Sequence, residues 1–174
     1  QVDALAQTAA NQGKYVVSKA RVDAVDVQRS SAFGTCFLDA SDLLGEAQLE
    51  WLVKLLDSHA DKPALLFAHH NPRLGGEPLH FPGGLEDSEP LWQAISTRKH
   101  VKAYIHGHIH HRNFFEHEGI HILNTPATSY VADKKTSTTG WTMLRLTPEG
   151  AEATTHTHQA DHAWNGVKVP LRWR

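Results

Sequence analysis

Two histidine groups hold the residue types best able to do chemistry in this 174-residue chain. The first is His69-His70-Asn71-Pro72, and the second is His106-Gly107-His108-Ile109-His110-His111. Each group follows a short apolar stretch, residues 64–68 and 101–105, that is typical of a buried strand. Open α/β sheets bind ligands where such strands end, so we expect both groups to lie at one edge of a sheet. Neutral imidazoles that converge in pairs are good ligands for zinc, manganese or iron.

Histidine is the unusual residue type here, with 14 His against 1 Cys and 1 Met. The single cysteine, Cys36, excludes a disulfide framework and a cysteine-based zinc cluster, so imidazole and carboxylate must supply any metal ligands. Residues i and i+2 of an extended segment share a face, so we expect His108 and His110 to aim at one point. Gly107 lets the backbone bend beside them. The alternative is a set of hydrogen-bonded histidines without a metal, and the pairing of two strand-end clusters argues against it.

The composition restricts the possible partners. Lys and Arg total 17, Asp and Glu total 19, and the formal net charge is -2. A dominant nucleic-acid or polybasic membrane surface would need a positive field that this balance does not supply. At 40% hydrophobic and 21% charged residues, the composition indicates a folded protein, and the apolar runs are too short for a transmembrane helix. We therefore expect a soluble protein, cytoplasmic by default, with no nucleic-acid or membrane partner.

The chemistry-bearing residues need a scaffold, and the sequence predicts a layered α/β domain that spans residues 1–174 as a single unit. A helix is expected to open at Gly45, because Leu49, Leu52, Val53 and Leu56 have the spacing of one buried helical face. The loop 71–86 is rich in Gly and Pro and is long enough to suggest a functional role. The other expected elements are helices at 3–11 and from 87 or 88 to 97, and strands at 15–18, 22–27, 33–38, 113–117, 120–123, 141–147 and 151–158.

These motifs resemble the calcineurin-like metallophosphoesterases. The resemblance rests on the ordered pair Pro63-Ala64-Leu65-Leu66-Phe67-Ala68-His69-His70-Asn71-Pro72 and Gly107-His108-Ile109-His110. Leu38-Asp39-Ala40-Ser41 and the helix that starts with Gly45-Glu46-Ala47-Gln48 are similar to the family's strand and helix before the first motif. The likeness covers residues 33–147, and the bacterial phosphodiesterase-like branch is the nearest.

The resemblance implies a four-layer αββα sandwich that holds two divalent or trivalent ions of Mn, Fe or Zn. In that family a bridging hydroxide attacks the phosphoester in line, and the two ions neutralise the developing charge. By family position, His69 and His108 would bind one ion and His110 the other. His70 and Asn71 would lie near the phosphate or support the ligands. Arg73 and His80, in the following loop, could reach the substrate or simply be solvated, and Arg73 would pair with a phosphate oxygen.

The chain departs from the family in one respect. The family's other ligands come from three N-terminal motifs, D-x-H, G-D and G-N-H-[DE], and none of them is found in a suitable context. Asp57-Ser58-His59 spells D-x-H, but it follows an amphipathic helix, and we interpret it as a solvated helix terminus. Residue 1 is Gln, so we expect a C-terminal portion of such a domain that lacks its N-terminal strands. The uncovered sheet edges would then need an oligomer or the N-terminal segment to cover them.

Two functional hypotheses follow from the resemblance. The first is a metal-dependent phosphoester hydrolase, a phosphodiesterase or small-molecule phosphatase, complete only together with the N-terminal motifs. The sequence assigns no catalytic residue for it. The alternative is a catalytically inert metal-binding or interaction module of the same fold, because the bridging carboxylate is missing from the motifs present.

Overall fold

The computed structural model describes residues 15–17, 26–28, 34–37, 43–74, 84–131 and 133–174. Only the backbone is described for the first three stretches, and the helix expected at 3–11 lies outside these residues. These stretches form three short strands, β1 (Tyr15–Val17), β2 (Asp26–Gln28) and β3 (Gly34–Phe37), and β1 pairs antiparallel with β2. Each overlaps one of the strands expected at 15–18, 22–27 and 33–38.

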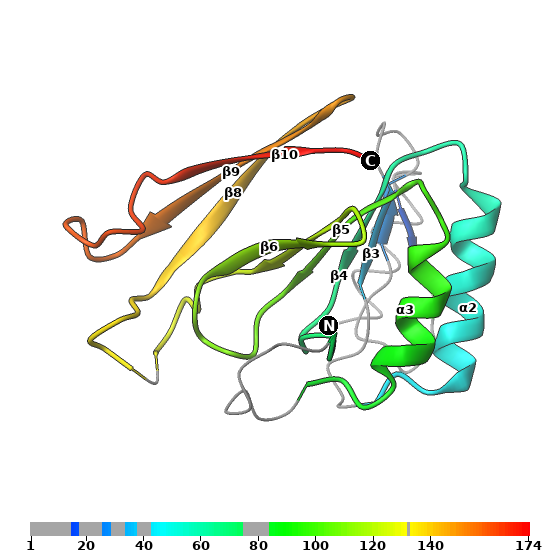
Figure 1. Cartoon of the computed structure of the whole chain (residues 1–174), viewed down its shortest axis with the longest axis horizontal. Coiled ribbons are helices and arrows are strands. Elements are labelled where there is room, and N and C mark those ends of the chain that lie inside the picture. Colours follow the sequence, from blue (N-terminus) through cyan, green and yellow to red (C-terminus); the bar gives the residue numbers. More distant parts are fainter. Residues whose placement is uncertain (1–14, 18–25, 29–33, 38–42, 75–83, 132) are drawn as a thin grey trace.

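The main sheet has five strands in the order β3-β4-β5-β7-β6 (Figure 1). Its parallel strands are β3, β4 (Ala64–Phe67), β5 (Val101–His106) and β7 (Ile120–Asn124), and β6 (Asn113–His117) runs antiparallel to β7. Nearly every residue of β4, β5 and β7 is buried. Parallel strands that are covered on both faces read as continuous apolar runs, which explains the runs seen in the sequence.

Two helices cover one face of this sheet, α2 (Glu46–Ser58) and α3 (Ser88–Ser96) (Figure 1). Leu52 and Leu56 of α2 are buried, so the apolar face expected from the spacing is confirmed. The carboxylate of Asp87, just before α3, accepts hydrogen bonds from the backbone N–H groups of Leu44 and Gly45 at 3.1 and 2.8 Å. A negative charge at the start of α2 interacts favourably with the helix dipole and ties the two helices together.

A second sheet packs against the other face. It is antiparallel, in the order β10-β9-β8, with β8 (Gly140–Thr147), β9 (Gly150–Thr157) and β10 (Lys168–Arg172). Buried residues of both sheets form a second core that includes Leu65, Ile105, Leu123, Ala153 and Leu171. The helix–sheet–sheet layers confirm the expected α/β sandwich and correspond to three of the four expected αββα layers. Within the described ranges no helix covers the outer face of the three-stranded sheet.

The strand β10 was not among the elements expected from the sequence. It contains Pro170, which has no N–H to donate to a sheet and therefore argues against a central strand. The structure explains its presence, because β10 lies at the edge of its sheet and pairs with β9 alone. No helix in the described part of the chain is both long and apolar enough to cross a membrane.

Arg174 joins the end of β10 to the helix side of the main sheet. Its guanidinium donates to five backbone carbonyls, which lie at the end of α3, at the start of β5 and in the β6–β7 turn. They belong to Ile95, Ser96, Arg98, Val101 and Glu118, at 2.7–3.3 Å. The carbonyls of Ile95 and Ser96 lie in the last turn of α3, where helix carbonyls lack i+4 partners, and those of Ile95 and Arg98 also accept from backbone N–H groups.

We expect Arg174→Ala to lower the free energy of unfolding by about 2–3 kcal/mol, because five hydrogen bonds from one charged donor are lost. Urea denaturation followed by far-ultraviolet circular dichroism measures this change. Arg174→Lys should have an intermediate effect, since one ammonium cannot reach five acceptors. A loss below about 0.5 kcal/mol, the range of ordinary surface substitutions, would contradict the assignment.

Tyr104 of β5 fixes the backbone at the first histidine group. Its ring is fully buried, and its hydroxyl donates to the carbonyl oxygen of His70 at 2.9 Å. Burial raises the pKa of Tyr104, so the hydroxyl keeps its proton and remains a donor.

We expect Tyr104→Phe to cost about 1–3 kcal/mol of unfolding free energy, because the buried carbonyl of His70 would lose its partner. Thermal or urea unfolding of the purified variant measures the cost. A matched change of an exposed tyrosine, Tyr130→Phe, should have no measurable effect. Equal stabilities of Tyr104→Phe and the unchanged chain would show that this bond does not hold the loop.

Candidate metal centre

The two histidine groups meet because β4 and β5 are parallel neighbours. Phe67 pairs with Ile105 in the strand register, and the N–H of Ala68 donates to the carbonyl of Ile105 at 3.0 Å. One step further, the N–H of Gly107 donates to the carbonyl of His69 at 3.2 Å. The backbones of the two loops are thus joined at the edge of the sheet where both strands end, as the sequence predicted.

Three imidazoles converge at this edge, those of His69, His70 and His108. One ligand atom from each lies within 4.8 Å of the other two. The closest approach is 3.3 Å, between Nδ1 of His108 and Nε2 of His69. The ring centres of His70 and His108 are 4.2 Å apart. His70 is buried, His108 is half-buried and His69 is exposed, so the group is open to solvent on one side.

The loop that carries His108 is not extended, which corrects the expectation that His108 and His110 share one face of an extended segment. Strand β5 ends at His106, and His108 and His110 have positive φ angles of 66° and 55°. This left-handed conformation costs about 1–2 kcal/mol for each residue with a side chain. The bend turns His108 toward His69, so the side chains of His108 and His110 do not lie on the same side of the chain.

His110 lies apart from the three-histidine group. Its ring packs edge-on against Tyr130, with the ring centres 4.3 Å apart. His106, the first histidine of the second group, is buried on β5 with its ring 5.9 Å from that of Tyr104. Burial lowers the pKa of His106 to about 4, so this imidazole is neutral at physiological pH.

Asn71 and Arg73, the other residues expected at the site, lie along the chain that leaves the cluster. Asn71 is buried, its carbonyl accepts from the N–H of Leu85 at 2.9 Å, and its Oδ1 has no hydrogen-bond partner among the described residues. Arg73 is exposed and lines a hollow on the α3 side beside Trp92. Its backbone N–H donates to Ser88 Oγ at 2.7 Å. His80 lies outside the described residues.

The Asp57-Ser58-His59 sequence ends helix α2, as the sequence analysis interpreted it. Arg98 donates to both carboxylate oxygens of Asp57, at 2.8 and 2.9 Å, and lowers the pKa of that exposed carboxyl. His59 Nδ1 lies 3.0 Å from the carbonyl oxygen of Leu55. Helix α2 ends where β4 begins, whereas the cluster follows the end of β4. The D-x-H sequence is therefore at the opposite edge of the sheet from the three imidazoles.

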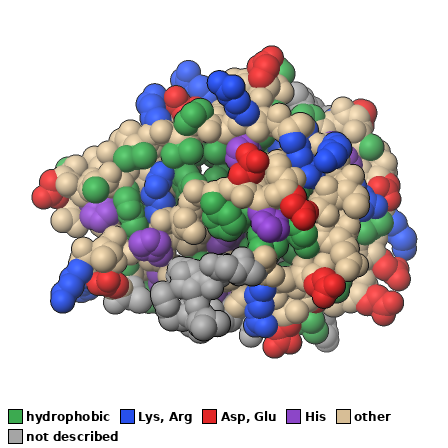
Figure 2. Space-filling view, in the orientation of Figure 1, with side chains coloured by type: hydrophobic (Ala, Val, Ile, Leu, Met, Phe, Trp, Pro, Cys, Tyr) green, Lys and Arg blue, Asp and Glu red, His purple; other side chains and the backbone are tan. Residues whose placement is uncertain are grey.

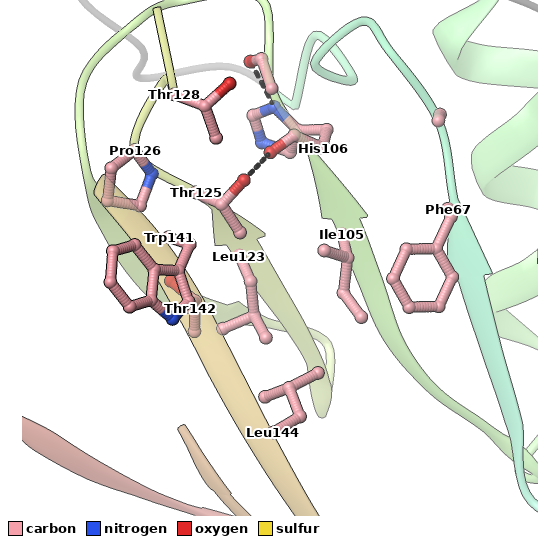
Figure 3. Close-up of a pocket in the computed structure, with 12 residues that line it drawn as sticks. Phe67, Ile105, His106, Leu123, Thr125, Pro126, Thr128, Trp141, Thr142 and Leu144 are labelled. Carbon is pink, nitrogen blue, oxygen red and sulfur yellow. Dashed lines mark hydrogen bonds between the residues drawn. The ribbon is translucent and has the colours of Figure 1, made fainter. Parts of the chain in front are cut away.

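A cavity of about 340 Å³ lies between the two sheets beside the cluster (Figure 3). Ala68 and Gly107, which directly precede His69 and His108, are among its lining residues. Its walls are mostly apolar, and Trp141 stands at one side. The hydroxyl of Thr125 donates to the carbonyl of His106 there. The remaining lining residues are Phe67, Ile105, Leu123, Pro126, Thr128, Thr142 and Leu144.

The donor set fits a transition-metal ion. Three imidazole nitrogens suit zinc, manganese or iron, and no carboxylate belongs to the group within the described ranges. The exposed side leaves room for further ligands and for a substrate. Histidine side chains reach the surface at several separate places on the face of the molecule shown in Figure 2. From the sequence, His70 is expected beside the site, near the phosphate or supporting the ligands, and the structure brings its imidazole into the three-histidine group.

Relatives of the chain are bacterial phosphodiesterases. It is 31% identical over 114 residues to the 3',5'-cyclic adenosine monophosphate phosphodiesterase CpdA of Vibrio vulnificus, which is 62% of this chain and 42% of that protein. It is 30% identical over 125 residues to CpdA of Escherichia coli K12, which is 67% of this chain and 44% of that protein. The chain thus spans less than half the length of these relatives. No family model matches it.

Solved structures support the same fold. A dimetal phosphatase from Danio rerio superposes with a TM-score of 0.58 at 15% identity, over 75% of this chain and 39% of that one. At this identity the likeness concerns the fold alone. The resemblance that the two histidine motifs indicated is therefore confirmed, and the chain is a relative of the calcineurin-like metallophosphoesterases, in their bacterial phosphodiesterase branch.

Proposed function

We propose that the protein containing this chain hydrolyses phosphodiesters with the help of transition-metal ions that the chain helps to hold. The single observation that carries the proposal is the 3.3 Å approach of His69 Nε2 and His108 Nδ1 across two parallel strands. Two imidazole nitrogens this close, with a third imidazole beside them, form a donor set for one ion.

The ligand roles keep the assignment that the family resemblance implies. His69 and His108 hold one ion, and His110 serves a second ion in a dinuclear centre. Two such ions, with a bridging hydroxide, would supply the nucleophile and neutralise charge on the phosphate. His110 stands apart from the other two imidazoles, against Tyr130, which supports its assignment to a different ion.

Neighbouring residues would orient the phosphoester. His70 is buried against His108, and its backbone is fixed by Tyr104, so its ring has a defined position beside the proposed ion. Asn71 follows it directly and brings an amide to the same loop. We propose that His70 and Asn71 contact the phosphate or hold the ligands, and that Arg73 neutralises charge on a bound substrate.

The substrate class we propose is a small phosphodiester that carries an apolar or aromatic group, such as a cyclic nucleotide. The cavity beside the cluster supports this, because its volume falls in the range of small-molecule sites and its wall is apolar with threonine hydroxyls. The relatives support it as well, since they are named as cyclic nucleotide phosphodiesterases.

A second candidate is an inert metal-binding module of the same fold. The observation that favours it is the composition of the cluster, which within the described ranges consists of imidazoles without a carboxylate. Metal binding is common to both candidates, and hydrolysis separates them.

The ligand assignment predicts that His69→Ala and His108→Ala weaken the binding of the same ion. We expect each to raise the Co²⁺ dissociation constant more than about 100-fold, beyond the effect of losing a supporting contact. Titration of the metal-free protein, followed by visible absorption, measures it. His110→Ala should leave this ion bound, and His59→Ala should change nothing. Unchanged affinity in His69→Ala and His108→Ala would refute the assignment.

The proposed activity predicts Mn²⁺-dependent hydrolysis of 3',5'-cyclic AMP and of bis(p-nitrophenyl) phosphate by the longest natural protein that contains this chain. His108→Ala should lower kcat at least about 10³-fold, since the ion contributes several kcal/mol to the transition state. His59→Ala is the matched control and should retain full activity. Metal binding without hydrolysis in that protein would favour the inert module, and metal-independent hydrolysis would contradict both candidates.

A further inference from the structure

Arg112 lies between the two sheets, directly after the histidine loop. Its Nε donates to Oγ1 of Thr155 at 2.8 Å, and its guanidinium carbon is 4.3 Å from the centre of the Phe114 ring. Thr155 is fully buried on β9, the central strand of the second sheet. The Arg112 side chain thus connects the end of the loop after β5 to the three-stranded sheet.

The charge of Arg112 has no acidic counterpart in the described part of the chain. None of the ion pairs there involves it, and its buried Nη2 has no hydrogen-bond partner among the described residues. Burial also lowers the pKa of Arg112. Arg112 is half-buried, and withdrawing part of a guanidinium from water costs free energy unless its contacts offset that cost. Its described side-chain contacts are those with Thr155 and the Phe114 ring, and only the first is a hydrogen bond that an apolar side chain could not make.

The loop that precedes Arg112 needs an anchor. It contains the two left-handed residues His108 and His110, and its described backbone hydrogen bonds are those of Gly107 N–H to His69 and of Ile109 N–H to Gly107. Such a loop keeps a strained shape only when its surroundings hold both ends. Its first end is held by the bond to His69.

The second end of the loop is held by polar contacts around His111 and Arg112. The side-chain amide of Asn124, on β7, donates to the carbonyl of His111. Nδ1 of His111 lies 2.7 Å from Oγ of Ser137, which precedes β8. Of these contacts, the one from Arg112 reaches furthest across the core, to the middle strand of the second sheet.

We propose that Arg112 is a positioning residue that holds the histidine loop through Thr155 so that His108 points at His69. It touches neither the proposed ion nor the substrate. The proposal rests on the proposed function in so far as His108 binds metal, but the order of the loop can be measured without metal.

The test uses two readouts and a matched set of variants. Amide hydrogen exchange of Gly107 and Ile109 in the metal-free protein reports the order of the loop, and a Co²⁺ titration reports the ligand set. Arg112→Met removes the charge and keeps the apolar contact with the neighbouring ring, because a thioether packs well against aromatics. Thr155→Val removes the acceptor and Thr155→Ser keeps it. Arg145→Met, on the exposed side of β8, controls for loss of a positive charge.

We expect Arg112→Met to raise the exchange rates of both amides about 10-fold and the Co²⁺ dissociation constant about 10- to 100-fold. Its Tm should change by less than about 4 °C. Thr155→Val should reproduce the faster exchange, while Thr155→Ser and Arg145→Met should behave as the unchanged chain.

Unchanged amide exchange and Co²⁺ affinity in Arg112→Met would overturn the positioning role. A large loss of Tm in Arg112→Met, with faster exchange throughout β9 and β10, would also overturn it, because Arg112 would then be a general structural residue. Absence of Co²⁺ binding by the longest natural protein that contains this chain would refute the proposed function, and the amide exchange would still decide the role of Arg112.

Discussion

The parallel pairing of β4 with β5 is the constraint on which the candidate site depends. Parallel neighbours end at the same edge of a sheet, so residues that follow them are brought together although they are far apart in sequence. Here the ladder continues beyond both strands, through Ala68 to Ile105 and Gly107 to His69. These two hydrogen bonds fix the distance between the backbone segments that carry His69 and His108. The two apolar cores, one under the helices and one between the sheets, keep this ladder in place.

The segments that form the candidate metal site contain backbone conformations and buried polar groups that are locally unfavourable. Two histidines adopt a left-handed conformation, and Oδ1 of buried Asn71 has no hydrogen-bond partner among the described residues. Each of these features costs free energy. Buried polar atoms without a described partner also occur elsewhere, on Gln48 of α2 and Asn124 of β7, but the two left-handed histidines belong to one loop at the site. Locally unfavourable backbone on a stable scaffold is typical of a site built for binding.

Much of this arrangement could be predicted from the sequence. The spacing of Leu49, Leu52 and Leu56 predicted α2, and the apolar runs before the histidines predicted β4 and β5 and therefore the meeting of the two groups. What failed was the treatment of residues beyond the strand ends as extended. Periodicity of two holds only within a strand, so it missed the turn at His108 and wrongly aimed His108 and His110 at one point. Long-range partners such as Arg112 and Thr155 have no signature in sequence, because their meeting depends on how the two sheets pack.

X-ray absorption spectroscopy of the zinc-loaded protein examines the proposed metal site itself, because it counts imidazole ligands and measures their distances. We expect at least two imidazole nitrogens at about 2.0–2.1 Å from the ion, and the loss of at least one of them in His108→Ala. A first shell made of oxygen atoms alone, or one unchanged by His108→Ala, would contradict the claim that His69 and His108 form a metal site.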